Sequence, residues 1–272
     1  MHIFLALSLF ALTALADRSL IITNDCSYTV YPAVLNTLVG GGYTGPRGWE
    51  AAAGSSNTVS IPDTWNGRVW ARRGCTFDST GAGSCVAGDC GGGLECADAT
   101  TGWANWLEMN LNSWAGMDFW DISAVPGASS SSFPPPLALP AAVPPLPRRR
   151  FPFPRRAPIA HNVSSDLNPT CPNSLMQITD NGETIGCLSA CMAGINAGTN
   201  SANCCSGTFD GLYACLSSEV DYYSQVFFKN GCENAYAYPF DSRPGSPTVD
   251  QTCAAADTPS YTVTFCPAAA AK

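Results

Sequence analysis

Residues 105–123, NWLEMNLNSWAGMDFWDIS, contain two strand-like runs joined by the four residues SWAG. An antiparallel hairpin that is symmetric about this turn pairs Glu108 directly with Asp121. Residues opposed in this way have Cβ atoms about 4.5 to 5.5 Å apart, and like charges at such positions destabilise a sheet. The sequence therefore predicts two adjacent carboxylates at a cost in stability, which indicates that the pair has a function.

The sequence before and after this hairpin also favours β-structure. Between positions 19 and 73 it contains four short runs separated by Gly, Pro and Asn clusters: SLIITND, YTVYPAVLN, SNTVSIP and GRVWARR. Near the end of the chain, YTVTFC at 261–266 alternates apolar and polar side chains, as a half-buried strand does. These runs predict an all-β fold.

The chain contains fourteen cysteines, all after position 16, and their even number predicts up to seven disulfides in an oxidising compartment. Four lie in a Gly-rich stretch that has too few apolar residues for a core of its own, which predicts a small disulfide lobe at 75–96. Seven more predict a larger lobe at 161–232, with a helix near 184–197 that places Cys187 and Cys191 on one face.

Several segments are expected to lie outside this framework. Residues 1–16 have the apolar run and small-residue end of a signal peptide, and no later run is long enough to span a membrane, so we expect a secreted chain beginning at Asp17. Residues 126–160 hold eleven of the 21 prolines and no acidic residue, which predicts a disordered insertion. Residues 268–272 form a short tail. Asn162 is the one acceptor with an allowed N-x-S/T sequence, and we expect it to be glycosylated.

Charge and residue usage exclude several classes of partner and site. The net charge is -8, and five of the arginines lie in the insertion, so the remaining chain is still more acidic. Such a body repels nucleic acid and anionic lipid, and we expect a monomer with a neutral or cationic partner. Metal sites and cofactors are not expected, because His161 is the only histidine after position 16. The same histidine, without a G-x-S-x-G motif, argues against a Ser-His-Asp site.

The order of these features resembles the thaumatin-like proteins, a secreted pathogenesis-related family. The matching motifs span nearly the whole chain outside the insertion: RVWAR at 68–72, the Gly- and Cys-rich stretch at 81–96, LEMNLN at 107–112, DFWDIS at 118–123, the cysteine pair at 204–205, FFKNGC at 227–232, AYAYPFD at 235–241 and YTVTFCP at 261–267.

This resemblance implies a two-sheet β-sandwich formed by residues 17–74, 97–125 and 233–267, with an acidic cleft between the sandwich and the larger lobe. It also implies six disulfides: Cys26–Cys266, Cys75–Cys85, Cys90–Cys96, Cys171–Cys187, Cys191–Cys204 and Cys205–Cys215. The usual partners of Cys232 and Cys253 are missing, because residues 123–170 contain no cysteine. We expect these two to form a seventh bridge; the alternative is two free thiols.

The resemblance also assigns Glu108 and Asp121 to the cleft, where a carboxylic acid and a carboxylate are the pair that glycoside hydrolysis uses. The other residues predicted for the substrate-binding cleft are Arg68, Arg72, Asp118 and Asp241. Strand parity nevertheless turns Asp118 to the face opposite Asp121. Pro126 stands where the family usually has a further aspartate, so the expected cleft has one acid fewer.

The functional prediction is a secreted protein that binds β-1,3-glucan, or another cell-wall polysaccharide, and hydrolyses it weakly in wall remodelling or defence. One alternative is a non-catalytic antifungal protein directed at walls or membranes, and another is an inhibitor of a secreted hydrolase. For Glu108 and Asp121 themselves, the alternative is an ordinary pair on a sheet surface, solvated or paired with arginine.

Overall fold

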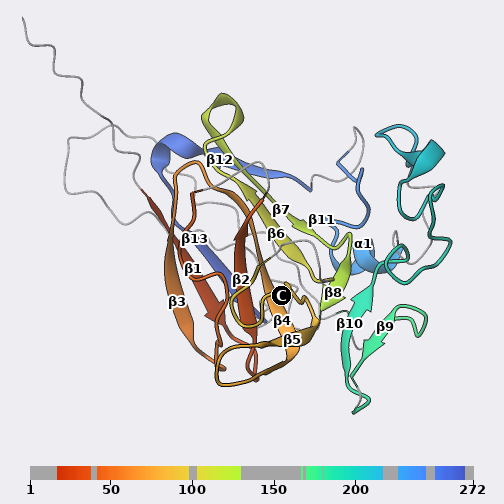
Figure 1. Ribbon diagram of the computed structural model, residues 1–272. Helices are drawn as coiled ribbons and strands as arrows, with labels where there is room; N and C mark the ends of the chain where they lie inside the picture. Colours follow the sequence, from red (N-terminus) through yellow and green to blue (C-terminus); the bar gives the residue numbers. More distant parts are fainter. Residues whose placement is uncertain are drawn as a thin grey trace, which may run out of the picture.

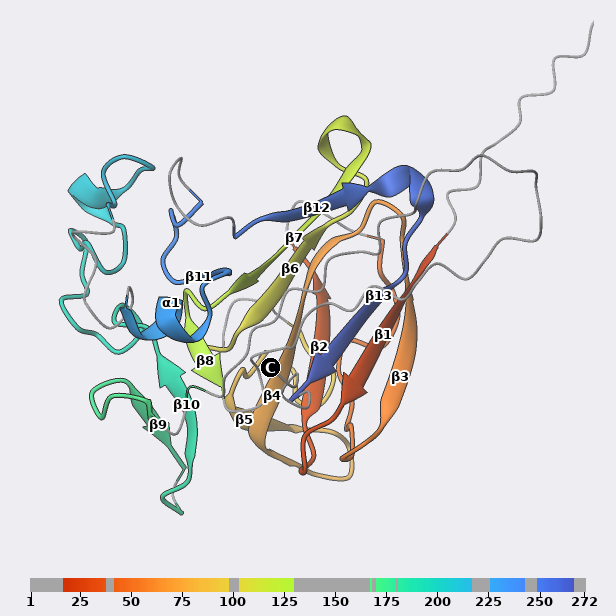
Figure 2. The same ribbon diagram turned by 180° about the vertical axis from the view of Figure 1, so that it is seen from behind.

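The computed structural model describes residues 17–37, 42–97, 103–129, 167, 170–179, 181–216, 226–242 and 249–266. Within these ranges the fold consists mainly of β-strands in two facing sheets, with a third, smaller sheet at one side (Figures 1 and 2). The predicted signal peptide, most of the predicted insertion, Asn162 and the tail lie outside the described residues.

The larger sheet is centred on the hairpin that the sequence analysis singled out. Its strand order is β11-β7-β6-β4-β2, with β12 also on β7 and β5 on β4. The strands are β2 (Tyr31–Asn36), β4 (Asn66–Phe77), β5 (Gly83–Ala87), β6 (Trp106–Asn110), β7 (Met117–Ser123), β11 (Ala235–Tyr236) and β12 (Gln251–Ala254).

The facing sheet brings the two ends of the described chain together. Its order is β13-β1-β3, from the strands β1 (Arg18–Asn24), β3 (Ser56–Ile61) and β13 (Tyr261–Phe265). Strands β1 and β13 run parallel, and the Cys26–Cys266 disulfide joins the chain just beyond both. Because β1 and β13 are parallel and far apart in the sequence, no tight turn can connect them. The disulfide is the covalent link that keeps the two strands in register.

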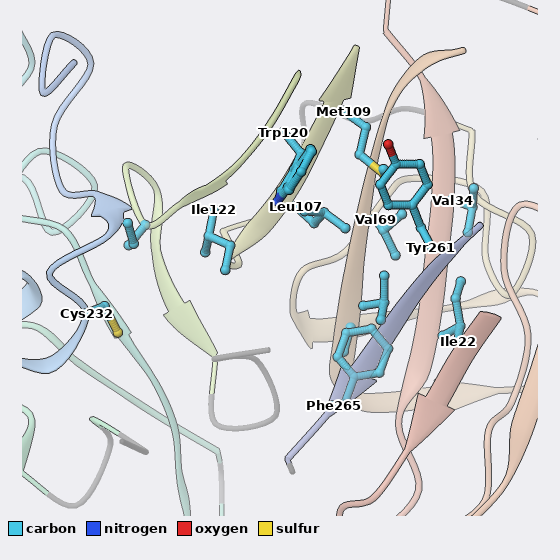
Figure 3. Close-up of a cluster of buried hydrophobic side chains, with 14 of the residues drawn as sticks. Ile22, Val34, Val69, Leu107, Met109, Trp120, Ile122, Cys232, Tyr261 and Phe265 are labelled. Carbon is cyan, nitrogen blue, oxygen red and sulfur yellow. The ribbon is translucent and has the colours of Figure 1, made fainter. Parts of the chain in front are cut away.

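The core lies between these sheets. Figure 3 shows Ile22, Tyr261 and Phe265 directed toward side chains of the larger sheet, including Leu107 and Met109. Because successive side chains on a strand point to opposite faces, burial of Leu107 and Met109 turns Trp106, Glu108 and Asn110 to the outer face. The hydrophobic core therefore fixes which face of the hairpin carries the acidic pair.

A buried ion pair cluster connects the two sheets on the core side of β7. Asp118 is fully buried, where it accepts hydrogen bonds from the Arg18 guanidinium and the Tyr261 hydroxyl, while Arg18 also pairs with Asp63. The prediction that Asp118 belongs to the cleft is therefore wrong. The alternation of β7 directs its side chain into the core, as parity indicated.

The third sheet has the order β8-β10-β9, formed by β8 (Gly127–Ser129), β9 (Met176–Ile178) and β10 (Thr184–Leu188). Two sequence predictions are corrected here. The first residues of the predicted insertion form β8 instead of disordered chain. The helix predicted near 184–197 is a strand followed by turns, because β10 pairs on both sides and Gly194 has a φ of 76°, outside the helical region.

Helical structure is sparse among the described residues. The single α-helix is α1 (Phe228–Gly231), and short 3₁₀ turns lie at Trp114–Gly116, Gly207–Phe209 and Ala255–Asp257. None of these helices is long and apolar enough to cross a membrane.

All six disulfides implied by the resemblance are present. The predicted seventh is wrong, because Cys232 and Cys253 are free thiols. Cys253 lies opposite Asp118 at one end of β7, whereas Cys232 adjoins β11, which meets β7 at Ile122. Asp118 and Ile122 are four strand positions apart, about 13 Å. A disulfide requires Cα atoms within about 7 Å.

We expect alkylation of the denatured, unreduced protein to label Cys232 and Cys253 and none of the other cysteines. In the native state labelling should be slow, because burial raises the pKa of both thiols and leaves little reactive thiolate. Peptide mapping by mass spectrometry measures both results. A cross-linked peptide that contains Cys232 and Cys253 would contradict the structure.

Candidate functional site

The outer face of the larger sheet contains a cleft of about 440 Å³ beside β6 and β7. Its lining includes the aromatic residues Trp106 and Tyr236, the cation Arg68, and the acids Glu108, Asp121 and Asp250. Strands β4, β6 and β7 supply four of these side chains, and the segments next to β7 supply the other two.

The hairpin register predicted from the sequence is confirmed, because Glu108 pairs with Asp121. On the other side of β6, Glu108 pairs with Arg68, so three ionisable side chains form one row across the sheet. The Arg68 Nε donates a hydrogen bond of 2.7 Å to Glu108 Oε1, and its guanidinium carbon lies 4.2 Å from the centre of the Trp106 ring. Arg68 is thus held by a carboxylate and an aromatic face together.

Asp121 differs from Glu108 in its surroundings. Burial raises the pKa of Asp121 to about 8, with further contributions from Glu108 and Asp250 that Arg68 only partly offsets. Its Oδ1 is buried and has no hydrogen-bond partner within the described residues. At neutral pH the row therefore contains a protonated acid next to a carboxylate that is paired with arginine, the two forms that general acid and base chemistry requires.

Sequence reasoning missed the third acid of the cleft. Asp250 directly precedes β12 and lines the cleft, where its Oδ1 accepts a hydrogen bond of 2.7 Å from the Tyr236 hydroxyl. The expected cleft had one acid fewer because of Pro126, and Asp250 brings a carboxylate from another part of the chain. No local pattern pointed to Asp250, since its place depends on the pairing of β12 with β7.

Two residues predicted for the cleft lie elsewhere. Arg72 is buried, donating to the carbonyls of Gly93 at 2.8 Å and Leu94 at 2.7 Å, and burial lowers its pKa to about 10. These hydrogen bonds connect β4 to the small disulfide lobe. Asp241 is also buried, paired with the Lys229 ammonium at 2.8 Å. The structure thus brings Arg68, Glu108 and Asp121 together and places Arg72, Asp118 and Asp241 outside the cleft.

Across the described residues, no cluster of three or more His, Cys, Asp and Glu side chains has the arrangement needed to hold a metal ion. The side chains of the cleft supply a proton on Asp121 and the charge pair of Arg68 with Glu108.

Comparison with known proteins gives one consistent family. The model of the Thaumatin family matches residues 24–267. Pathogenesis-related thaumatin-like protein 3.5 of Cryptomeria japonica is 37% identical, over 90% of this chain and 88% of its own length. A thaumatin-like protein of Arabidopsis thaliana is 33% identical, over 98% and 97%. Pathogenesis-related protein 5 of the same plant is 34% identical, over 90% and 88%.

Among solved structures, the thaumatin-like xylanase inhibitor TLXI aligns with 91% of this chain and 99% of its own, with 20% identity and a TM-score of 0.39. A similarity at this level carries no argument about activity.

Proposed function

This chain belongs to the thaumatin family, and on that premise we propose that it is a secreted defence protein whose acidic cleft binds a β-1,3-glucan and hydrolyses it slowly. The proposal depends above all on the direct pairing of Glu108 with Asp121 in the cleft, one carboxylate and one carboxylic acid. The six disulfides favour an oxidising compartment. The pathogenesis-related relatives support the defence role.

In this proposal each member of the acid pair has one task. Asp121 donates its proton to the glycosidic oxygen, so that the departing sugar leaves as an alcohol. Glu108 remains ionised and stabilises the positive charge that develops at the anomeric carbon. A water molecule then adds to this carbon and returns a proton to the Asp121 carboxylate, which completes the hydrolysis. Trp106 and Tyr236 offer apolar ring surface to the sugars on either side. Because Arg68 pairs with Glu108, part of the negative charge of this carboxylate is already compensated, which favours slow turnover.

The test is the Glu108→Gln variant. Incubated with a soluble β-1,3-glucan, it should release reducing ends about 100-fold more slowly than the parent, because the amide cannot stabilise the developing charge. Its binding to an insoluble β-1,3-glucan should persist, since glutamine keeps the size of the side chain and one acceptor oxygen. Glu183→Gln is the matched control, because Glu183 pairs with Arg73 outside the cleft, and it should behave like the parent.

Three results would contradict parts of this proposal. An unchanged rate in Glu108→Gln would place hydrolysis at another site. Binding by the parent without any release of reducing ends would favour the non-catalytic wall-binding alternative. Absence of both binding and hydrolysis would remove β-1,3-glucan as the ligand of the cleft.

A further inference from the structure

Asp121 is flanked by carboxylates on both sides of its strand. Strand β6 places Glu108 opposite Asp121. On the other edge of β7, β12 runs antiparallel with Gln251 opposite Trp120, so continuing this register by one residue places Asp250 opposite Asp121. Figures 1 and 2 show β12 beside β7 from both directions. Residues opposed in this way share one face of a sheet, and like charges between them are unfavourable.

The described residues that line the cleft include too few cations to neutralise this row. Arg68 is the one cation among the described residues that line the cleft, and it is already paired with Glu108. Among the described residues, Asp121 and Asp250 therefore share no partner of opposite charge. Asp250 is exposed to water and accepts a hydrogen bond, whereas Asp121 has a buried oxygen with no partner. Charge is favoured at the hydrated site, so the proton is expected on Asp121 and the negative charge on Asp250.

Tyr236 holds Asp250 without cancelling its charge. Tyr236 lies on β11, opposite Ser123 of β7, and its hydroxyl donates to Asp250 Oδ1 at 2.7 Å. Burial raises the pKa of Tyr236, and the nearby Asp250 raises it further, so the phenol keeps its proton and remains a donor. A lysine or arginine here would neutralise Asp250 and ease ionisation of Asp121. A neutral donor fixes the position of the carboxylate while preserving its field.

We propose that Asp250, held by Tyr236, is a positioning residue whose negative charge keeps Asp121 protonated as the proton donor of the cleft. Asp250 acts through Asp121 and is not itself a catalytic residue. The catalytic consequence depends on the function proposed above, but the protonation of Asp121 is a property of the folded protein alone. Among the described residues, the ionisable groups that face Asp121 from the elements around it are Glu108, Arg68, Asp250 and Tyr236.

The first experiment follows the carboxyl carbons of the aspartates by ¹³C NMR as the pH is varied. Asp121→Asn identifies the Asp121 signal by its loss. In the parent, this signal should titrate near pH 8. In Asp250→Asn, which keeps an oxygen acceptor for Tyr236 but removes the charge, the midpoint should fall by about one pH unit. Asp210→Asn removes the same charge from an exposed site outside the cleft and should leave the midpoint unchanged.

Tyr236→Phe provides a second test that preserves all the carboxylates. Loss of the hydroxyl releases Asp250 toward water, so the midpoint of Asp121 should fall in the same direction but by less. An unchanged Asp121 midpoint in a folded Asp250→Asn variant would overturn the proposal. If that variant does not fold, an unchanged midpoint in Tyr236→Phe would overturn it instead.

The pH profile of glucan hydrolysis separates this proposal from the proposed function. Activity requires a protonated Asp121. The alkaline limb of the pH profile should therefore shift to lower pH in Asp250→Asn, by the same number of pH units as the NMR midpoint. A shifted NMR midpoint in a protein that does not hydrolyse glucan supports the role of Asp250 and contradicts the enzymatic function. If Asp250→Asn hydrolyses glucan with the same alkaline limb as the parent, the proposed role of Asp250 is contradicted but the enzymatic function is not.

Discussion

Replacement of Arg18 by alanine is expected to lower the free energy of unfolding by about 3 to 5 kcal/mol. The Arg18 guanidinium is buried between Asp63 and Asp118, and Asp118 also accepts the Tyr261 hydroxyl. Without the arginine, two carboxylates remain close together in the core with no cation. The effect is large because the two carboxylates lose their hydration on folding, and in the variant no arginine compensates for that loss.

Denaturant unfolding at pH 7 measures this loss. Arg47→Ala is the matched control, because Arg47 is exposed, and its effect should stay within about 0.5 kcal/mol. The penalty in Arg18→Ala should shrink as the pH falls. At low pH the unpaired acids bind protons, so that no uncompensated charge remains buried. If the free energy of unfolding fell by less than about 1 kcal/mol, or by an amount independent of pH, Arg18 would not stabilise the fold through its ion pairs with Asp63 and Asp118.

The acidic pair could be predicted from sequence because it depends on a local hairpin. The short turn and the strands on either side lie within nineteen residues, and they determine both the register and the face of Glu108 and Asp121. Parity likewise indicated that Asp118 points away from them. Such predictions need no knowledge of distant chain segments.

The sequence predictions failed for site residues whose environment is decided by distant segments of the chain. Arg72 has the same strand parity as Arg68, but the carbonyls of Gly93 and Leu94 cover it, so an equivalent position becomes a buried structural contact. Asp250 enters the cleft because β11 and β12 share one edge of β7 in opposite directions. A local pattern of apolar residues does not determine which strand pairs with the edge of β7, or in which direction that strand runs.

The neutral variant Asp121→Asn is expected to be more stable than the parent at pH 7, by up to about 4 kcal/mol. In the folded protein the pKa of Asp121 is about 8, whereas an unfolded chain has a value of about 3.9. A raised pKa contributes stability that is complete below about pH 4 and is lost as the pH rises toward 8. Asparagine has no proton to lose, so the variant and the parent should differ least near pH 4 and most above pH 8.

Denaturant unfolding at pH 4 and pH 7 measures this difference, with the exposed Asp25→Asn as a control that should remain within about 0.5 kcal/mol of the parent at both values. Equal stability of Asp121→Asn and the parent at pH 7 would contradict the raised pKa. If glucan hydrolysis requires the proton of Asp121, the same substitution that stabilises the fold must abolish that activity. Under the proposed function, this opposition between stability and activity is the result expected of a working acid, whereas an ordinary residue of the sheet surface would show the gain in stability without the loss of activity.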